Sequence, residues 1–222
     1  DLVAVLTGTP KAPTLDLVDP VGRAVEVLAV PGFFDAIHFS PDGRFGVMVY
    51  SQGGFSGVAA RNLNEIALLA VNSRAVTRLQ LDTESLPPTR VLFGPGQAGR
   101  QLVALSLVRG VALFDALHPE VAPRRISIRP QGSALESEVQ ETIFSRDERY
   151  LFLRASNLDD VIVVELGAEV GLPVSASINF VAGGAGLTDI EAPPPGFDDA
   201  VLAVYATSRE AFLLDARGIS DN

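Results

Sequence analysis

Apolar residues along the chain fall into short runs separated by tight polar turns, a pattern that predicts β-hairpins. The clearest example spans residues 33–50, where two apolar stretches flank a polar turn. In that turn, Pro41 fixes φ at the first central position, and Asp42 and Gly43 accept the conformations that follow. We therefore predict two antiparallel strands joined by a tight turn.

This hairpin pattern returns with a period of about 50 residues, which lies in the range of propeller blades. Phe39, Phe93 and Phe144 each stand at the end of the first apolar run, and a looser fourth copy covers 189–205. We expect these three phenylalanines to be buried at equivalent positions between neighbouring blades. A second marker, an apolar run that ends in an acidic or small residue, has the same period and occurs at 15–19, 66–70, 111–115, 161–165 and 211–215.

A third run with alternating apolar and polar residues often follows the second marker, at 24–30, 76–81 and 125–129. Such alternation is typical of a strand with one wet face. Each repeat is then four short strands, and the predicted fold is an all-β propeller of four-stranded antiparallel blades. A partial blade covers 1–30, blades cover about 31–82, 83–130 and 131–181, and a partial blade covers 182–222.

The two terminal repeats are expected to be incomplete. Residues 2–6 match a second strand, so the first repeat has no inner strand, and the last repeat stops after its third strand. Because open sheet edges favour association, we expect these five repeats to be part of a larger ring.

Two other structural interpretations are open. A β-sandwich would contain similar hairpins. In addition, residues 63–71 place apolar side chains at helical spacing, although Asn62, Asn64 and Asn72 are unfavourable there. The β-branched run at the matching positions 161–165 favours a strand.

Residues 39–44, followed by an apolar strand and a run like that at 15–19, resemble the YVTN-type and related WD-like repeats of bacterial β-propellers. The repeat pattern extends over essentially the whole chain, but only the copy at residues 39–44 closely matches the sequence of these repeats. The copy at Phe144 carries Arg146, Asp147 and Glu148 in place of Pro-Asp-Gly. The resemblance implies the architecture of the protein but does not indicate its activity, because propellers host many functions.

The amino-acid composition excludes several classes of function. With 17 basic and 27 acidic residues the net charge is −10, which gives no electrostatic support for nucleic-acid binding. Cysteine is absent, which excludes disulfides, thiolate metal sites and cysteine nucleophiles, and two histidines cannot form a multi-histidine zinc site. No apolar run is long enough for a membrane-spanning helix. We expect a periplasmic, cell-surface or secreted protein.

The first candidate site lies where the inner strands begin, at the mouth of the expected central channel. Asp35, Arg90, Glu141 and Asp189 stand at these positions in four repeats. Three carboxylates and one arginine could bind a divalent cation such as calcium, or a polar ligand. The alternative is a hydrated, self-neutralised channel without a ligand.

The second candidate is the long glycine-rich loop that follows the second strand of the second repeat. It carries Gln52, Phe55, Arg61 and Asn62, which we expect to contact a partner. An insertion without function is the alternative.

Together these features favour a non-catalytic binding or scaffold propeller that presents loops on one face to a protein or glycan partner, or to the remaining blades of a longer chain. No catalytic residues are predicted. The alternative is a propeller hydrolase similar to lactonases, with a divalent cation at the channel mouth.

Overall fold

A computed structural model describes residues 2–9, 11–50, 63–81, 87–97, 99–129, 137–167, 175–193, 196–199, 201–207 and 210–219. The chain divides into two compact units, Asp1–Val91 and Leu92–Asn222. The described residues form antiparallel β-sheets and one short 3-10 helix, η1 (Ala216–Gly218). None of their helices is long and apolar enough to cross a membrane.

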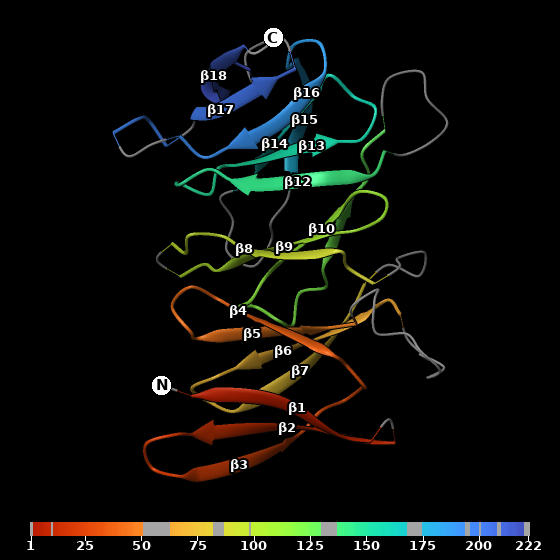
Figure 1. The fold of residues 1–222 in the computed structure, drawn as a ribbon, viewed down its shortest axis with the longest axis vertical. Coiled ribbons are helices and arrows are strands. Elements are labelled where there is room, and N and C mark those ends of the chain that lie inside the picture. Colours follow the sequence, from red (N-terminus) through yellow and green to blue (C-terminus); the bar gives the residue numbers. More distant parts are fainter. Residues whose placement is uncertain are drawn as a thin grey trace. The chain divides into compact units, whose positions relative to one another are not determined.

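The first unit contains two sheets (Figure 1). One has three strands in the order β1 (Val3–Thr9), β2 (Ala12–Asp19) and β3 (Ala24–Ala29). The other has four strands in the order β4 (Ala36–Phe39), β5 (Phe45–Val49), β6 (Glu65–Ala70) and β7 (Ala75–Gln80). The β6 strand shows that residues 65–70 are extended, so the helical interpretation of 63–71 is wrong.

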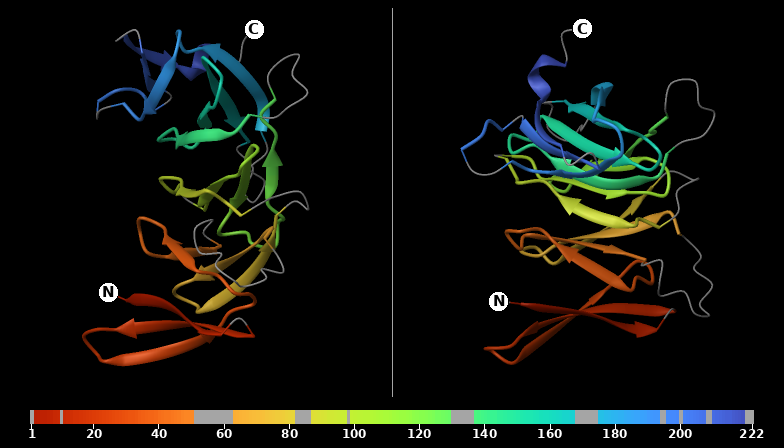
Figure 2. Two further views of the ribbon diagram at one scale, coloured as in Figure 1. Left: turned by 45° about the vertical axis from the view of Figure 1, so that its right-hand side comes forward. Right: turned by 45° about the horizontal axis from the view of Figure 1, so that its top comes forward.

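The second unit contains three sheets, which Figure 2 shows in two further views. The first has the order β11 (Arg124–Ile126), β10 (Val111–Asp115), β9 (Leu102–Ser106) and β8 (Arg90–Phe93), and β8 starts at the end of the first unit. The next has β12 (Val139–Phe144), β13 (Tyr150–Ala155), β14 (Asp160–Leu166) and β15 (Ser175–Ala182). The last has β16 (Leu187–Glu191), β17 (Val201–Ala206) and β18 (Ala211–Asp215).

Five antiparallel sheets of three or four strands confirm the predicted fold class. Among the described residues, the first and last sheets have three strands each and the other sheets have four.

Strands in the middle of the second unit are apolar on both faces because a sheet packs against each face. In β13, Leu151 and Leu153 pack toward the sheet that contains β9 and β10. Tyr150 and Phe152 alternate with them and pack toward β16 and β17. Burial on two sides explains why these runs are continuously apolar rather than alternating.

The β4–β5 turn is held by its own side chains. The Ser40 hydroxyl donates to Asp42 Oδ1 at 2.7 Å, and Asp42 Oδ1 also accepts from the N–H of Arg44 at 3.0 Å. Gly43 adopts φ of 70°. Serine and aspartate at this spacing therefore close the turn that the sequence predicted.

The diverged β12–β13 turn keeps the same network. Ser145 donates to Asp147 Oδ1 at 2.6 Å, and Asp147 accepts from the N–H of Arg149 at 3.1 Å. Glu148 occupies the position of Gly43 and has φ of 54°, a left-handed conformation that is unfavourable for a residue with a side chain.

The prediction that three equivalent phenylalanines are buried is wrong for Phe39. Phe144 is 7% exposed and lies in the core, and Phe93 is half-buried, but Phe39 is 42% exposed. Phe39 pairs across the strands with Gly46 and its ring lies against that glycine. A glycine offers no side chain to cover the ring, so Phe39 stays accessible to solvent.

Candidate functional site

The structure brings together two of the predicted site residues, Glu141 on β12 and Asp189 on β16. In both strands the pairing register with the second strand shifts just before the acidic residue, between Val139 and Glu141 and between Leu187 and Asp189. Such β-bulges redirect the side chain that follows them. The two carboxyl groups therefore come from equivalent positions in adjacent sheets.

Arg154 completes this cluster. It lies directly across from Glu141 in the β12–β13 register, and its Nε donates to Glu141 Oε2 at 2.7 Å. The backbone N–H of Ile190 donates to Glu141 Oε2 at 3.2 Å and to Asp189 Oδ1 at 2.9 Å. All three charged side chains are partly exposed, so solvent and ligands can reach the cluster.

The two carboxyl groups differ in electrostatic environment. Burial raises the pKa of Glu141, but the hydrogen bond and positive charge of Arg154 outweigh it, and the pKa is lowered overall. Partial burial and the adjacent Glu141 carboxylate raise the pKa of Asp189. Glu191 adds to this repulsion. Two or three carboxylates with one guanidinium leave an excess of negative charge that a positively charged group would relieve.

The other two predicted channel residues belong to the first unit. Asp35 is exposed just before β4, and its N–H donates to Val49 O at 3.2 Å. The strand register makes Ala36, not Asp35, the equivalent of Glu141, because Ala36 pairs with Val49. Arg90 is exposed at the first residue of β8.

A metal site receives no support from the described residues. They contain no group of three or more His, Cys, Asp or Glu side chains that could hold a metal ion. The partner-loop residues Gln52, Phe55, Arg61 and Asn62 lie outside the part of the chain that the structure describes.

Sequence reasoning missed Arg154. The sequence did contain an indication of its role, because this arginine is the one charged residue in the otherwise apolar run of β13. A charged residue in such a run needs a partner. The antiparallel register would have placed that partner on the strand before it, at Glu141.

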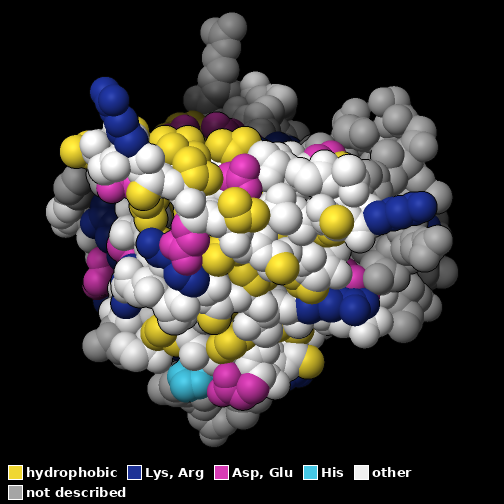
Figure 3. Space-filling view, turned by 90° about the horizontal axis from the view of Figure 1, so that it is seen from below, with side chains coloured by type: hydrophobic (Ala, Val, Ile, Leu, Met, Phe, Trp, Pro, Cys, Tyr) yellow, Lys and Arg dark blue, Asp and Glu magenta, His cyan; other side chains and the backbone are white. Residues whose placement is uncertain are grey.

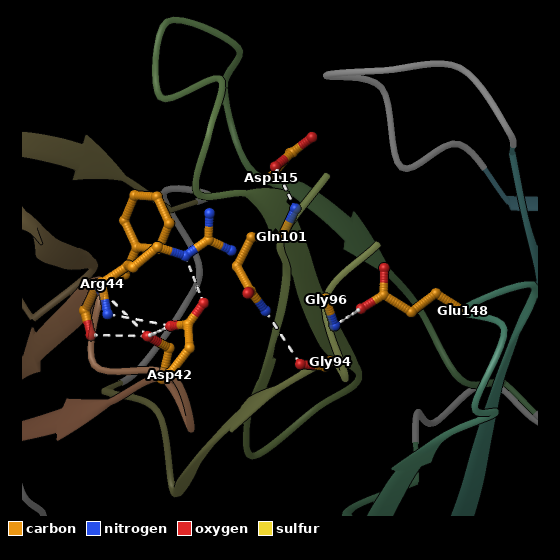
Figure 4. A network of polar contacts seen from close by, with 9 residues as sticks. Asp42, Arg44, Gly94, Gly96, Gln101, Asp115 and Glu148 are labelled. Carbon is orange, nitrogen blue, oxygen red and sulfur yellow. Dashed lines mark hydrogen bonds and ion pairs between the residues drawn. The ribbon is translucent and has the colours of Figure 1, made fainter. Parts of the chain in front are cut away.

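A second polar cluster joins the β8–β9 turn to the β12–β13 turn (Figure 4). Glu148 is 1% exposed, and its Oε1 accepts from the backbone N–H of Gly96 at 2.7 Å. A side chain at Gly94 would collide with the same oxygen. Gln101 Nε2 donates to Gly94 O at 3.0 Å and holds the near side of this turn.

Two more hydrogen bonds cross between these sheets. Gln97 Nε2 donates to Arg146 O at 2.9 Å, and Arg100 Nη1 donates to Gly167 O at 2.8 Å. Among the described residues, Glu148 Oε2 and two nitrogens of Arg100 are buried without a hydrogen-bond partner. Burial raises the pKa of Glu148, against the opposing effects of the Gly96 N–H and Arg100. We assign this cluster to the attachment of one sheet to the next.

Solved structures with the same arrangement of strands share little sequence with this chain. Dihydro-heme d1 dehydrogenase NirN matches at a TM-score of 0.59 and 15% identity, over 98% of this chain and 42% of that chain. The WD40 domain of Toxoplasma gondii coronin matches at 0.57 and 11% identity, over 99% and 54%. The Cps50 (Swd1) β-propeller domain of Myceliophteria thermophila matches at 0.53 and 13% identity, over 97% and 66%.

The fold is a β-propeller. One of these neighbours is a WD40 domain, and the WD-like and YVTN-type character of this chain's own repeats stays a prediction. The chain spans 42% to 66% of the length of these three solved chains. No protein-family model matches it, and no curated protein matches it significantly. Identities this low establish the fold alone.

Proposed function

We propose that this protein is a non-catalytic binding or scaffold propeller, and that the Glu141–Asp189 pair takes a basic side chain of a protein partner. The observation that carries the proposal is the placement of the pair. Two bulged inner strands bring two carboxyl groups together, and Arg154 supplies a single positive charge.

The charge balance favours a cation over an anion. Asp189 bonds one backbone N–H and is repelled by Glu141, so an incoming guanidinium or ammonium group would lower the energy of the ionised pair. A protein side chain suits the site better than a bare metal ion, because Arg154 already occupies one side of Glu141. Rigid inner strands would hold the carboxylates in place before binding, which reduces the entropy cost of association.

An array of random-sequence peptides tests this proposal. We expect the peptides that the protein binds to be enriched in Arg and Lys, and we expect Asp189→Asn to weaken their binding about fivefold to tenfold, or about 1–1.4 kcal/mol. Asn keeps an oxygen for the N–H of Ile190. Glu138→Gln, an exposed carboxylate next to β12, is the matched control.

Equal binding by the wild type and Asp189→Asn would contradict the proposal. The hydrolase alternative predicts a different result, namely calorimetric Ca²⁺ binding that Asp189→Asn abolishes. The structure does not favour that alternative. Glycan binding would appear as retention on a glycan array, and the structure supplies no specific support for it.

A further inference from the structure

The outer strands of two neighbouring sheets in the second unit differ in length. β15 has eight residues, whereas β11 has three. Each is the edge strand of its sheet in the described part of the chain. Pro123 stands directly before β11 and has no N–H to donate to β10, which accounts for the late start of the pairing at Arg124.

The strand registers show which part of β15 extends beyond β11. Leu113 of β10 and Val163 of β14 occupy equivalent positions in their repeats. Arg124 pairs with Leu113, and Asn179 pairs with Val163. The residues of β15 that precede Asn179 therefore have no counterpart in β11.

Two large apolar side chains of β15 reach solvent at this place. Ile178 and Phe180 are 38% and 39% exposed. They pair with Val164 and Ile162, which are buried in the core between the two sheets. Because residues that pair across antiparallel strands share a face, Ile178 and Phe180 lie on the face that packs against the β8–β11 sheet. The short β11 leaves them accessible.

Exposed apolar side chains are common by themselves. On the face that Figure 3 shows, hydrophobic side chains lie among acidic and basic ones, as on most protein surfaces. Ile178 and Phe180 differ because they are two residues apart on one strand and continue a buried core out to solvent. A continuous apolar surface of this kind is typical of an interaction site.

Charge indicates what kind of segment fits this surface. Arg124 is exposed, and its pairing with Leu113 places it on the face of its sheet that packs against the β12–β15 sheet. Residues 109–129 contain four arginines and two acidic residues. Both acidic residues have partners, because Asp115 accepts two backbone N–H groups and Glu120 contacts His118. The local charge is therefore positive, although the whole chain carries −10.

We propose that Arg124, Ile178 and Phe180, which we call the edge site, bind an extended segment of a partner protein with an apolar residue beside an aspartate or glutamate. The apolar side chain packs on Ile178 and Phe180, and the carboxylate pairs with Arg124. The edge site is separate from the Glu141–Asp189 pair and selects the opposite charge. A second copy of the chain is a poorer occupant, since two copies with a net charge of −10 repel each other.

Selection from a phage library of random peptides tests this proposal. The wild type serves as the target, and a counter-selection with Phe180→Thr removes peptides that bind elsewhere. We expect the remaining peptides to be enriched in Leu, Ile or Phe beside Asp or Glu. Peptides without this enrichment, or the lack of any peptide that distinguishes the two proteins, would overturn the proposal.

Matched variants then measure each contribution by the fluorescence anisotropy of a selected peptide. We expect Ile178→Thr and Arg124→Gln each to weaken binding at least about fivefold. The controls are Phe197→Thr in the β16–β17 loop and Arg23→Gln in the β2–β3 turn, both at exposed positions, and they should have little effect. Since all four side chains reach solvent, the far-UV circular dichroism should stay unchanged.

Added salt separates the charged contribution from the apolar one. It should weaken binding to the wild type more than to Arg124→Gln, because salt screens the attraction between the guanidinium and a carboxylate. Equal effects of Arg124→Gln and Arg23→Gln would contradict the proposal. So would sedimentation that shows dimers of the wild type whose formation Phe180→Thr abolishes, because a second copy would then be the occupant. Binding that Asp189→Asn leaves unchanged shows that the edge site acts independently of the Glu141–Asp189 pair.

Discussion

Glu148 allows the sharpest test of how the sheets are joined. Its carboxyl group is buried, accepts one backbone N–H from the neighbouring sheet and has a second oxygen without a partner among the described residues. We expect Glu148→Ala to lower the free energy of unfolding by about 2 kcal/mol, because the N–H of Gly96 loses its acceptor and the space of the carboxyl is vacated. Glu148→Gln keeps an oxygen acceptor and removes the charge.

The pH dependence separates these two effects. Burial raises the pKa of Glu148 above its usual 4.5, so the folded state holds a proton that the unfolded state has already released. The contribution of the protonated Glu148 to folding stability is therefore fully present at pH values below the pKa of Glu148 in the unfolded chain. This contribution is lost as the pH rises through the higher pKa of Glu148 in the folded protein. Glu148→Gln cannot lose this stabilisation. We expect its stability relative to the wild type to increase from pH 4 to pH 7.

Urea unfolding followed by circular dichroism at several pH values measures this difference. Taking the difference between two proteins cancels the titration of all other carboxyl groups. A difference that stays constant with pH, or that decreases as the pH rises, would refute the raised pKa. Equal stability of Glu148→Ala and Glu148→Gln would show that the hydrogen bond to Gly96 does not stabilise the protein.

A double-mutant cycle extends this test. A methyl group at Gly94 would collide with Glu148 Oε1, so Gly94→Ala should displace the carboxyl and destabilise the protein about as much as Glu148→Ala. Because both changes break the same contact, their effects should be less than additive. Additive effects would contradict the contact.

Three further outcomes are expected. Leu153→Ala should lower the unfolding free energy by about 3 kcal/mol in urea, since Leu153 is 0% exposed and its removal leaves a cavity. The hydroxyls of Ser106 and Thr142 bond at 3.0 Å between β9 and β12, so Thr142→Val should cost about 1 kcal/mol, and less once Ser106→Ala is present. Slight burial raises the pKa of Asp42, but the N–H and guanidinium of Arg44 outweigh it, and the pKa is lowered below 3.8 overall. The wild type should therefore be more stable than Asp42→Asn at pH values above 3.8, and this difference should disappear as the pH falls through the lowered pKa.

The sequence alone determined most of the strands and their repeat. These features are local: alternation, β-branched runs and Ser-x-Asp turns specify short strands and hairpins without reference to distant residues. The diverged turn at 145–150 illustrates this, because its serine and aspartate keep the same hydrogen bonds although glycine and proline are replaced.

Only the tertiary structure decided which residues meet. The repeat grouped Glu141 and Asp189 with Asp35 and Arg90, but it could not show that a bulge precedes each of the two acidic residues or that Arg154 pairs with Glu141. Ala36 rather than Asp35 is the equivalent of Glu141, because Ala36 pairs with Val49 as Glu141 pairs with Arg154. Burial between sheets also depends on what lies across the strand, and for Phe39 that residue is the glycine at position 46.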